Sequence, residues 1–425
     1  EGGRFDLPIA LGILVASEQL NASDIYNYEF AGELALSGDL RAIKGALPFA
    51  IATRRAQRKL IIAADNAFEA AMPQDNIVFP ATTLLEVCQH LTQVKRLQKY
   101  DFAIPSAITD NIETVDIQDI HGQPHAKRAL EIAAAGRHSM LLIGPPGTGK
   151  TMLASRLPTI MPELTIDEAL EVAAVYSLGQ THISPIKWRD RPFRTPHHTA
   201  SAVAMVGGGS RPKPGEISLA HHGVLFLDEL PEYDRNVLEV LREPMEQGSI
   251  IISRANRKTT FPAKFQLIAA MNPCPCGHNG NPFKQCKCSK EQINRYQARI
   301  SSPLLDRIDM HIEVPTITAE LLNNATSSET SAAIKQRVQS AVRIQQQRSN
   351  KANSLLNNNE VKTVCILNKE GTAIIKKAIE LLNLSARGFY RILKVARTIA
   401  DLERSANIQP IHLQEALGFR AKINL

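Results

Sequence analysis

The sequence predicts an α/β protein in which a parallel-sheet core lies between a small α+β domain and a helical C-terminal domain. From Ile117 onward, short apolar runs alternate with loops and helical patterns, which is typical of a parallel sheet with crossover helices. After Pro315 only helical patterns remain, whereas in the first 90 residues short apolar runs alternate with helical patches. We therefore expect domains at 1–98, 117–314 and 315–425, with a linker at 99–116.

Length and composition limit the class of protein. The chain has 425 residues, of which 44% are hydrophobic and 21% charged, so it is long enough for two or three domains with real cores. No run approaches the roughly 20 apolar residues that a membrane span needs. A patterned apolar segment already occupies Phe5–Ala16 and no signal peptide precedes it, so we expect a cytoplasmic protein whose first domain is truncated at its start.

The N-terminal elements follow from local patterns. A helix is expected over Leu7–Val15 behind Asp6, and a turn at Ser37–Asp39. Ala46–Arg58 has a helical pattern, and Lys59–Ala63 is apolar and short enough for a buried strand.

Positive charge is concentrated in the last quarter of the chain. The net charge is +7, and residues 314–425 carry 16 Lys and Arg against 8 Asp and Glu. This surplus of eight is compatible with a surface that faces a polyanion, and equally with a solvated basic helical domain.

A phosphate-binding loop follows the apolar run Met140–Ile143. Its residues are Gly144, Pro145, Pro146, Gly147, Thr148, Gly149, Lys150 and Thr151. This order matches the pattern G-x4-G-K-[ST] between a strand and a helix, in which backbone N–H groups surround phosphate oxygens. Lys150 is expected at the β- and γ-phosphates, and the Thr151 hydroxyl at Mg²⁺. The loop predicts ATP as ligand.

Two further strands end in polar side chains. Val224–Leu227 is apolar and is followed by Asp228, expected at Mg²⁺, and Glu229, expected to polarise the attacking water. Gln266–Ala270 is followed by Asn272, whose amide would hold that water; a turn Asn before Pro273 is the alternative.

Two arginines are candidates for contact with a nucleotide. Arg307 lies between Asp306 and Asp309, as a surface ion pair or as an arginine finger that a ring supplies to the neighbouring subunit. Ser385 is expected to cap a helix that carries Arg387 in its first turn, with Arg391 as the alternative contact. A solvated basic helix face is the other interpretation.

Four of the six cysteines lie within 274–288, in the order Cys274, Cys276, Cys286 and Cys288. Two close pairs suit a closed, tetrahedral and structural zinc site in a reducing compartment. His278 could replace one thiolate, and four reduced thiols without metal remain the alternative.

A basic insertion precedes the acid strand. Between Trp188 and Ala220 it contains Arg189, Arg191, Arg194, Arg211 and Lys213. Such a glycine-rich hairpin suits contact with a nucleic-acid backbone without base readout, or a plain structural loop. The adjacent His197 and His198 have no carboxylate at ligand spacing, which disfavours a metal.

Taken together, four segments resemble the AAA+ ATPases related to magnesium chelatase: 144–151, 214–229, 272–277 and 304–309. The cysteine run and 396–402 are similar to the ComM/YifB branch of that group, and the resemblance extends over nearly the whole chain. It implies a hexameric ATP-driven ring that acts on single-stranded or branched DNA, promoting branch migration or unwinding in natural transformation and recombination. It also implies Asn272 as sensor 1, Arg307 as arginine finger and Arg387 as sensor 2, acting on the neighbour's nucleotide.

The same resemblance implies an N-terminal domain similar to the Lon protease domain. Arg4 then occupies the nucleophile position, and Leu47 the position of the catalytic lysine, with Lys44 three residues away. Without a serine there is no nucleophile, so we expect a non-catalytic scaffold and no peptidase activity. A motor subunit of a magnesium-chelatase complex, acting in metal insertion, is the alternative function.

Overall fold

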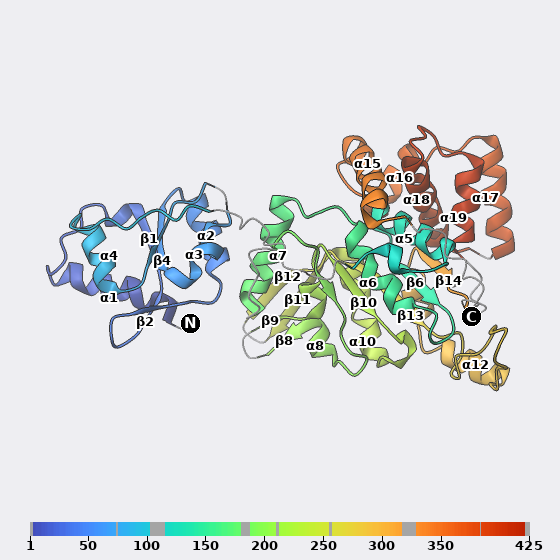
Figure 1. The fold of residues 1–425 in the computed structure, drawn as a ribbon, viewed down its shortest axis with the longest axis horizontal. Helices are drawn as coiled ribbons and strands as arrows, with labels where there is room; N and C mark the ends of the chain where they lie inside the picture. The colour runs from blue at the N-terminus through green and yellow to red at the C-terminus, as the bar shows by residue number, and fades with distance from the viewer. Residues whose placement is uncertain are drawn as a thin grey trace. The chain divides into compact units, whose positions relative to one another are not determined.

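The computed structural model describes residues 3–73, 75–102, 115–179, 188–209, 212–254, 257–316, 329–382 and 384–420 (Figure 1). The chain forms two compact units. The first comprises Glu1–Asp110 and Thr165–Asp190, and the second Asn111–Leu164 and Arg191–Leu425. In the described ranges, no helix is long and apolar enough to cross a membrane.

The first unit is built on a three-stranded parallel sheet in the order β1-β4-β5. Its elements are α1 (Asp6–Ala16), β1 (Tyr28–Ala31), β2 (Glu33–Leu34), β3 (Leu40–Arg41), α2 (Ala46–Arg55), β4 (Lys59–Ala63), α3 (Ala67–Ala71), β5 (Val78–Ala81), α4 (Leu84–Leu91) and α7 (Ile166–Gly179). Strand β4 has the predicted bounds. Helix α2 ends three residues before the predicted Arg58, because Gln57 takes a left-handed conformation with φ 54°.

Apolar side chains cover both faces of this sheet. Alternate residues of a strand point to opposite faces. Helix α1 lies on one side of the strands, and α2 and α3 lie on the other (Figure 1). Ile61 packs with Leu7 and Leu11 of α1, whereas Leu60 and Ile62 pack with residues of α2 and α3.

The second unit contains a five-stranded, all-parallel sheet in the order β14-β6-β13-β10-β7. Its strands are β6 (Met140–Ile143), β7 (Phe193–Arg194), β10 (Val224–Leu227), β13 (Gln266–Met271) and β14 (Met310–Glu313). The α/β class is therefore confirmed, and β6 and β10 have the predicted bounds. All five strands run in one direction, so their carboxyl ends share one edge, where ligands bind in such sheets.

Helices bury both faces of this sheet. They are α5 (Pro124–Gly136), α6 (Lys150–Ile160), α8 (Ala202–Val206), α9 (Glu216–Leu219), α10 (Arg235–Glu239), α11 (Arg242–Gln247), α12 (Lys290–Gln297) and α13 (Ser302–Leu305). Phe226 and Ile268 face a core shared with α5 and α6, whereas Leu225 and Leu267 face α9 and α10.

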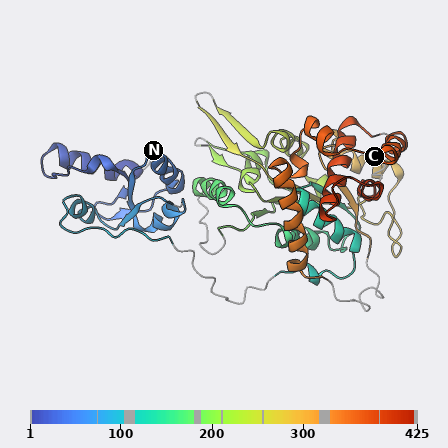
Figure 2. The ribbon, with the colours of Figure 1, turned by 90° about the horizontal axis from the view of Figure 1, so that it is seen from above.

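Two antiparallel hairpins belong to the same unit. One pairs β8 (Gly207–Gly208) with β9 (Lys213–Pro214), and the other pairs β11 (Ser249–Arg254) with β12 (Arg257–Pro262). Figures 1 and 2 place the two hairpins near each other at one end of this unit. Arg211, predicted at the first hairpin, lies outside the described residues.

The C-terminal part of the chain is helical, as predicted. Its helices are α15 (Ser331–Ser349), α16 (Asn358–Val364), α17 (Lys369–Leu382), α18 (Ala386–Leu402) and α19 (Pro410–Gly418). They gather beside α5 (Figure 1), and Ile392 and Leu393 of α18 share its core. Part of the first segment of the helical domain expected at 315–425 lies outside the described residues, as does most of the linker expected at 99–116.

Candidate nucleotide site and cysteine cluster

The phosphate-binding loop joins β6 to α6 at the carboxyl edge of the sheet. Gly147 and Gly149 have φ of 79° and 84°, the left-handed region that favours glycine. A Cβ at Gly144 would lie 2.2 Å from the Val314 carbonyl oxygen, so this position also excludes a side chain. The predicted glycines are thus the ones that the backbone requires.

Lys150 points back into this loop. Its Nζ donates to the carbonyl oxygens of Gly144 (2.8 Å) and Pro145 (2.9 Å) and to Oδ1 of Asn272 (3.2 Å). Burial lowers the pKa of Lys150, while the carboxylates of Asp228 and Glu229 act to raise it. The structure therefore brings the predicted Lys150 and Asn272 together from β6–α6 and β13.

The acid strand meets the start of α6. Oγ1 of Thr151 donates to Oδ2 of Asp228 at 2.6 Å, which gathers a hydroxyl and a carboxylate, the oxygen ligands that Mg²⁺ prefers. Glu229 follows with φ 51°, and its backbone N–H donates to Oδ1 of Asp228 at 2.9 Å. The left-handed backbone of Glu229 ends the extended conformation of β10 directly after Asp228.

His198 contacts Glu229, a role that the sequence did not suggest. Its Nδ1 lies 3.3 Å from Oε2 of Glu229. The Tyr233 hydroxyl anchors the same segment by donating to the Pro196 carbonyl at 2.6 Å. Burial, helped by Asp228 and Glu229, raises the pKa of Tyr233. His198 and Glu229, which are 31 positions apart, meet because β7 pairs with β10, and no local sequence pattern predicts that pairing.

The two predicted arginines converge on one carboxylate, Glu246 of α11. Nη2 of Arg307 lies 2.5 Å from Oε1 of Glu246, and Nη2 of Arg387 lies 3.7 Å from the same oxygen. Arg307 also donates to the Pro303 carbonyl at 2.6 Å and is only 6% exposed, whereas the Arg387 side chain is 59% exposed. Within the described part of the chain, neither arginine has a hydrogen bond or ion pair to the carboxylates of Asp228 or Glu229.

Arg391, the alternative to Arg387, is engaged elsewhere. It pairs with the buried Asp309, which also accepts from the Ser139 backbone at 3.1 Å and lies 3.3 Å from Nδ1 of His138. Burial alone would raise the pKa of Asp309, but Arg391 and His138 bring it well below its usual range. Arg391 thus stabilises the core, and the predicted cap of α18 is confirmed by Ser385, which accepts from the Gly388 N–H.

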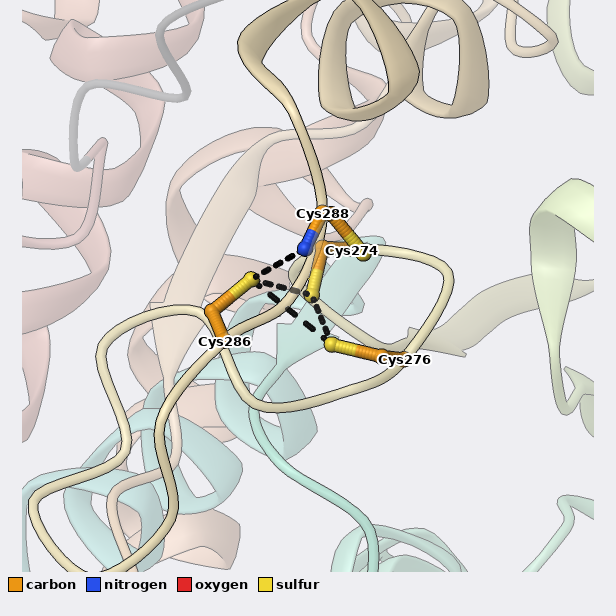
Figure 3. A group of neighbouring side chains, drawn as sticks. All are labelled: Cys274, Cys276, Cys286 and Cys288. Carbon is orange, nitrogen blue, oxygen red and sulfur yellow. Dashed lines mark hydrogen bonds between the residues drawn. The ribbon is translucent and has the colours of Figure 1, made fainter.

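The four cysteines form a compact cluster (Figure 3). The Sγ atoms of Cys274, Cys276 and Cys286 are 3.4–3.7 Å apart, and those of all four lie within 4.8 Å of one another. Tetrahedral zinc with Zn–S bonds of ~2.3 Å requires sulfurs about 3.8 Å apart, so the spacing fits. Backbone N–H groups of Lys287 and His278 lower the pKa of Cys276 to about 6. His278 is not a member of the cluster.

The cysteine loop contacts the phosphate-binding loop. Gly277 has φ 77°, and a Cβ there would lie 2.7 Å from Cδ of Pro146. The loop begins directly after Asn272, and Gln297 of α12 donates to the Pro273 carbonyl at 3.3 Å. The cluster is therefore adjacent to two segments of the candidate nucleotide site.

The two hairpins carry exposed lysines, Lys213 in β9 and Lys258 in β12. Sequence reasoning found the first hairpin but missed the second. A signal was present in the β-branched run Ile250–Ile252, which an eight-residue stretch, 253–260, separates from Phe261.

In the first unit, the positions compared with the Lon protease domain lack the serine and the lysine that its peptidase activity requires. Arg4 lies in a 3-10 turn at Gly3–Phe5, Leu47 is fully buried in α2, and Lys44 is exposed. Among these described positions there is neither a serine nor a buried amine.

Comparisons with known proteins agree with this architecture. Family models match three segments: "Magnesium chelatase, subunit ChlI" at 116–322, "Magnesium chelatase, subunit ChlI C-terminal" at 328–420, and "Subunit ChlI of Mg-chelatase" at 1–66.

Individual proteins also match, two of them over more than four fifths of their own length. Competence protein ComM of Haemophilus influenzae is 51% identical over 428 residues, covering 100% of this chain and 84% of the relative. Uncharacterized protein YifB of Escherichia coli is 48% identical, covering 99% and 82%. DNA replication licensing factor Mcm2 of Drosophila melanogaster is 26% identical over 45% of this chain and 20% of its own length. With its phosphate-binding loop on a five-stranded parallel sheet, the chain belongs to the ComM/YifB family of magnesium-chelatase-related AAA+ proteins.

Proposed function

We propose that this protein is an ATP-hydrolysing ring motor that acts on DNA in the cytoplasm, promoting branch migration in natural transformation and recombination. One observation carries the proposal. Lys150, Asp228, Glu229 and Asn272 gather at one sheet edge, while Arg307 and Arg387 meet separately at Glu246. Neighbouring subunits would complete one site from these two halves, which suits a hexamer.

Each residue at the sheet edge has a chemical task in this proposal. Residues 144–151 bind the phosphates of ATP, and Lys150 exchanges its carbonyl partners for β- and γ-oxygens. Thr151 and Asp228 would hold Mg²⁺, which when bound neutralises developing charge on the phosphates. Glu229, oriented by His198, accepts a proton from the attacking water, and the Asn272 amide orients that water. Arg307 and Arg387 stabilise the γ-phosphate of the adjacent subunit.

The DNA part of the proposal rests on charge and relatedness. Lys213 and Lys258 are exposed on the two hairpins, and residues 314–425 carry a surplus of eight positive charges. The name of the Haemophilus influenzae relative connects it with competence, and the Drosophila melanogaster relative is named for DNA replication. Aromatic residues make up only 5%, so contact with the phosphate backbone fits better than base stacking.

Replacing both Lys213 and Lys258 with Ala should weaken DNA binding and DNA-stimulated ATPase more than basal ATPase. Each phosphate contact releases counterions, so the slope of log K against log salt should fall by about two on duplex DNA. Fluorescence anisotropy across a salt series measures this. Lys95→Ala, which removes an exposed lysine from the first unit, is the matched control. An unchanged slope in the double variant would place the DNA contacts elsewhere.

We further propose that the cysteine cluster holds structural zinc and braces the loop beside Asn272 and Pro146. Four thiolates leave no open coordination position, so the metal would have no part in catalysis. The N–H groups of Asn279 and Cys288 donate to Sγ of Cys274 and Cys286, which acts to lower the pKa of these two thiols, whereas burial and the neighbouring thiols raise it.

Purified protein should contain about one zinc per chain. Joint replacement of Cys274 and Cys286 by Ser should abolish it, because two thiolates cannot complete a tetrahedral site. Cys88→Ser, in the first unit, should leave the zinc content unchanged. Plasma emission spectrometry of reduced, freshly purified protein decides the question, and a metal-free wild-type chain would refute the assignment.

The first unit is proposed to be a Lon-protease-like scaffold without peptidase activity, because Arg4 and Leu47 occupy the compared positions. The second candidate function, a motor subunit of a magnesium-chelatase complex, is favoured by the family descriptions at 116–322 and 328–420. That function needs partner subunits and a tetrapyrrole pathway, so the neighbouring genes distinguish the two.

A further inference from the structure

Glu246 is the carboxylate that joins the two arginines, and the proposed chemistry gives it no role. It lies near the C-terminal end of α11, and 48% of its side chain is exposed. One oxygen, Oε1, faces both Arg307 at 2.5 Å and Arg387 at 3.7 Å. These arginines are 80 residues apart in sequence. Glu246 therefore forms ion pairs with two separate segments, the segment after α13 that carries the first arginine and the first turn of α18.

This contact holds Arg307 within its own subunit. The Arg307 side chain is 6% exposed, its Nη1 donates to the Pro303 carbonyl, and its buried Nε has no partner in the described part of the chain. To contact the nucleotide of a neighbouring subunit, Arg307 has to break its ion pair with Glu246 first. The guanidinium groups bring two positive charges to one carboxylate, so a more highly charged anion would replace Glu246 favourably.

A cavity opens at this contact. It has a volume of about 260 Å³ and is lined by Glu239, Arg242, Glu243, Glu246, Gln247 and Arg307. This volume admits several water molecules beside the ion pair, so solvent reaches the contact between Glu246 and Arg307. Glu239 pairs with Arg242, which lowers the pKa of Glu239, so that carboxylate is already occupied.

Glu246 is also next to a hairpin. Gln247 and Gly248 alone separate it from β11, and Gly248 ends α11 with φ 67°. The Gly248 N–H donates to the Pro244 carbonyl at 2.8 Å, and the Gly248 carbonyl accepts from the Ala263 N–H at 2.8 Å. Both ends of the β11–β12 hairpin are thereby tied to the short segment that carries Glu246, so a displacement of the hairpin is transmitted to this carboxylate.

We propose that Glu246 is an inhibitory carboxylate: it retains Arg307 and Arg387 in their own subunit until the neighbour's γ-phosphate, helped by DNA on the β11–β12 hairpin, displaces it. This inference rests on the proposed function. It makes Glu246 a positioning residue that acts through the arginines, and it links DNA contact to hydrolysis within one subunit.

Glu246→Gln should raise the ATPase rate without DNA about fivefold. The substitution removes the ion pair that retains the arginines, and a partly exposed ion pair contributes about that factor to the equilibrium. The rate at saturating DNA should stay at the wild-type value, so the stimulation by DNA shrinks. Glu246→Ala should act in the same direction. The matched control is Glu243→Gln, on the same helix and cavity, with no ion pair to Arg307 in the described residues. On an Arg307→Ala background, Glu246→Gln should have no effect.

Equal DNA-free rates for Glu246→Gln and Glu243→Gln, or a lower rate for Glu246→Gln, would overturn the inference. So would a rise that persists without Arg307. Failure of the proposed function has a different signature: it appears in the wild type as an absent response to DNA, or in Arg307→Ala as an undiminished rate.

Discussion

Glu229→Gln should bind ATP as the wild type does but hydrolyse it about 100-fold more slowly. The substitution keeps the size of the side chain and its place beside His198, and removes only the base that accepts the proton of the attacking water. Single-turnover hydrolysis and equilibrium binding of a fluorescent nucleotide separate the two effects.

Glu232→Gln is the matched control for this variant. Glu232 lies three residues further along the chain, pairs with Arg299 at the surface and undergoes the same change of charge. Hydrolysis at the wild-type rate in Glu229→Gln would remove Glu229 as the base, whereas loss of ATP binding would indicate a damaged site rather than a missing base.

Arg307→Ala should bind ATP and lose hydrolysis by about 1000-fold, the effect of an arginine finger. The stronger test mixes it with Lys150→Ala subunits. An Arg307→Ala subunit keeps its own Lys150, and a Lys150→Ala neighbour supplies Arg307, so mixed rings should regain part of the activity. Steady-state ATPase across mixing ratios measures the rescue.

No recovery at any ratio would contradict a finger that acts between subunits. Arg299→Ala is a suitable control, because Arg299 forms a surface ion pair with Glu232 and is not assigned to the site. It should retain activity alone and gain nothing from mixing.

The parts of the site that the sequence predicted are those with local causes. The strands Met140–Ile143 and Val224–Leu227 are short, fully apolar and followed by glycines or acids, so their bounds and the loop between β6 and α6 could be predicted from neighbours in sequence. Parallel strands then bring their carboxyl ends to one edge, which explains how Lys150 meets Asn272 over 122 residues.

Contacts that depend on tertiary packing could not be predicted. His198 reaches Glu229 only because β7 pairs with β10, and Glu246 reaches Arg307 and Arg387 across three separate helical segments. No spacing of residues in the sequence predicts these contacts. Helix α7 is a similar case: it belongs to the same compact unit as residues of the N-terminal part, although its sequence lies within the stretch expected to form the ATPase core.

The measurement that tests the central claim most directly is the ATPase rate with and without single-stranded, duplex and four-way DNA at low salt. A DNA-acting motor predicts that at least one of these forms binds independently of sequence, raises the rate and loses its effect as salt increases. Lys150→Ala should show no hydrolysis under any of these conditions. If no form of DNA binds at low salt or changes the rate, the DNA motor is contradicted, and the magnesium-chelatase type of motor becomes the better account.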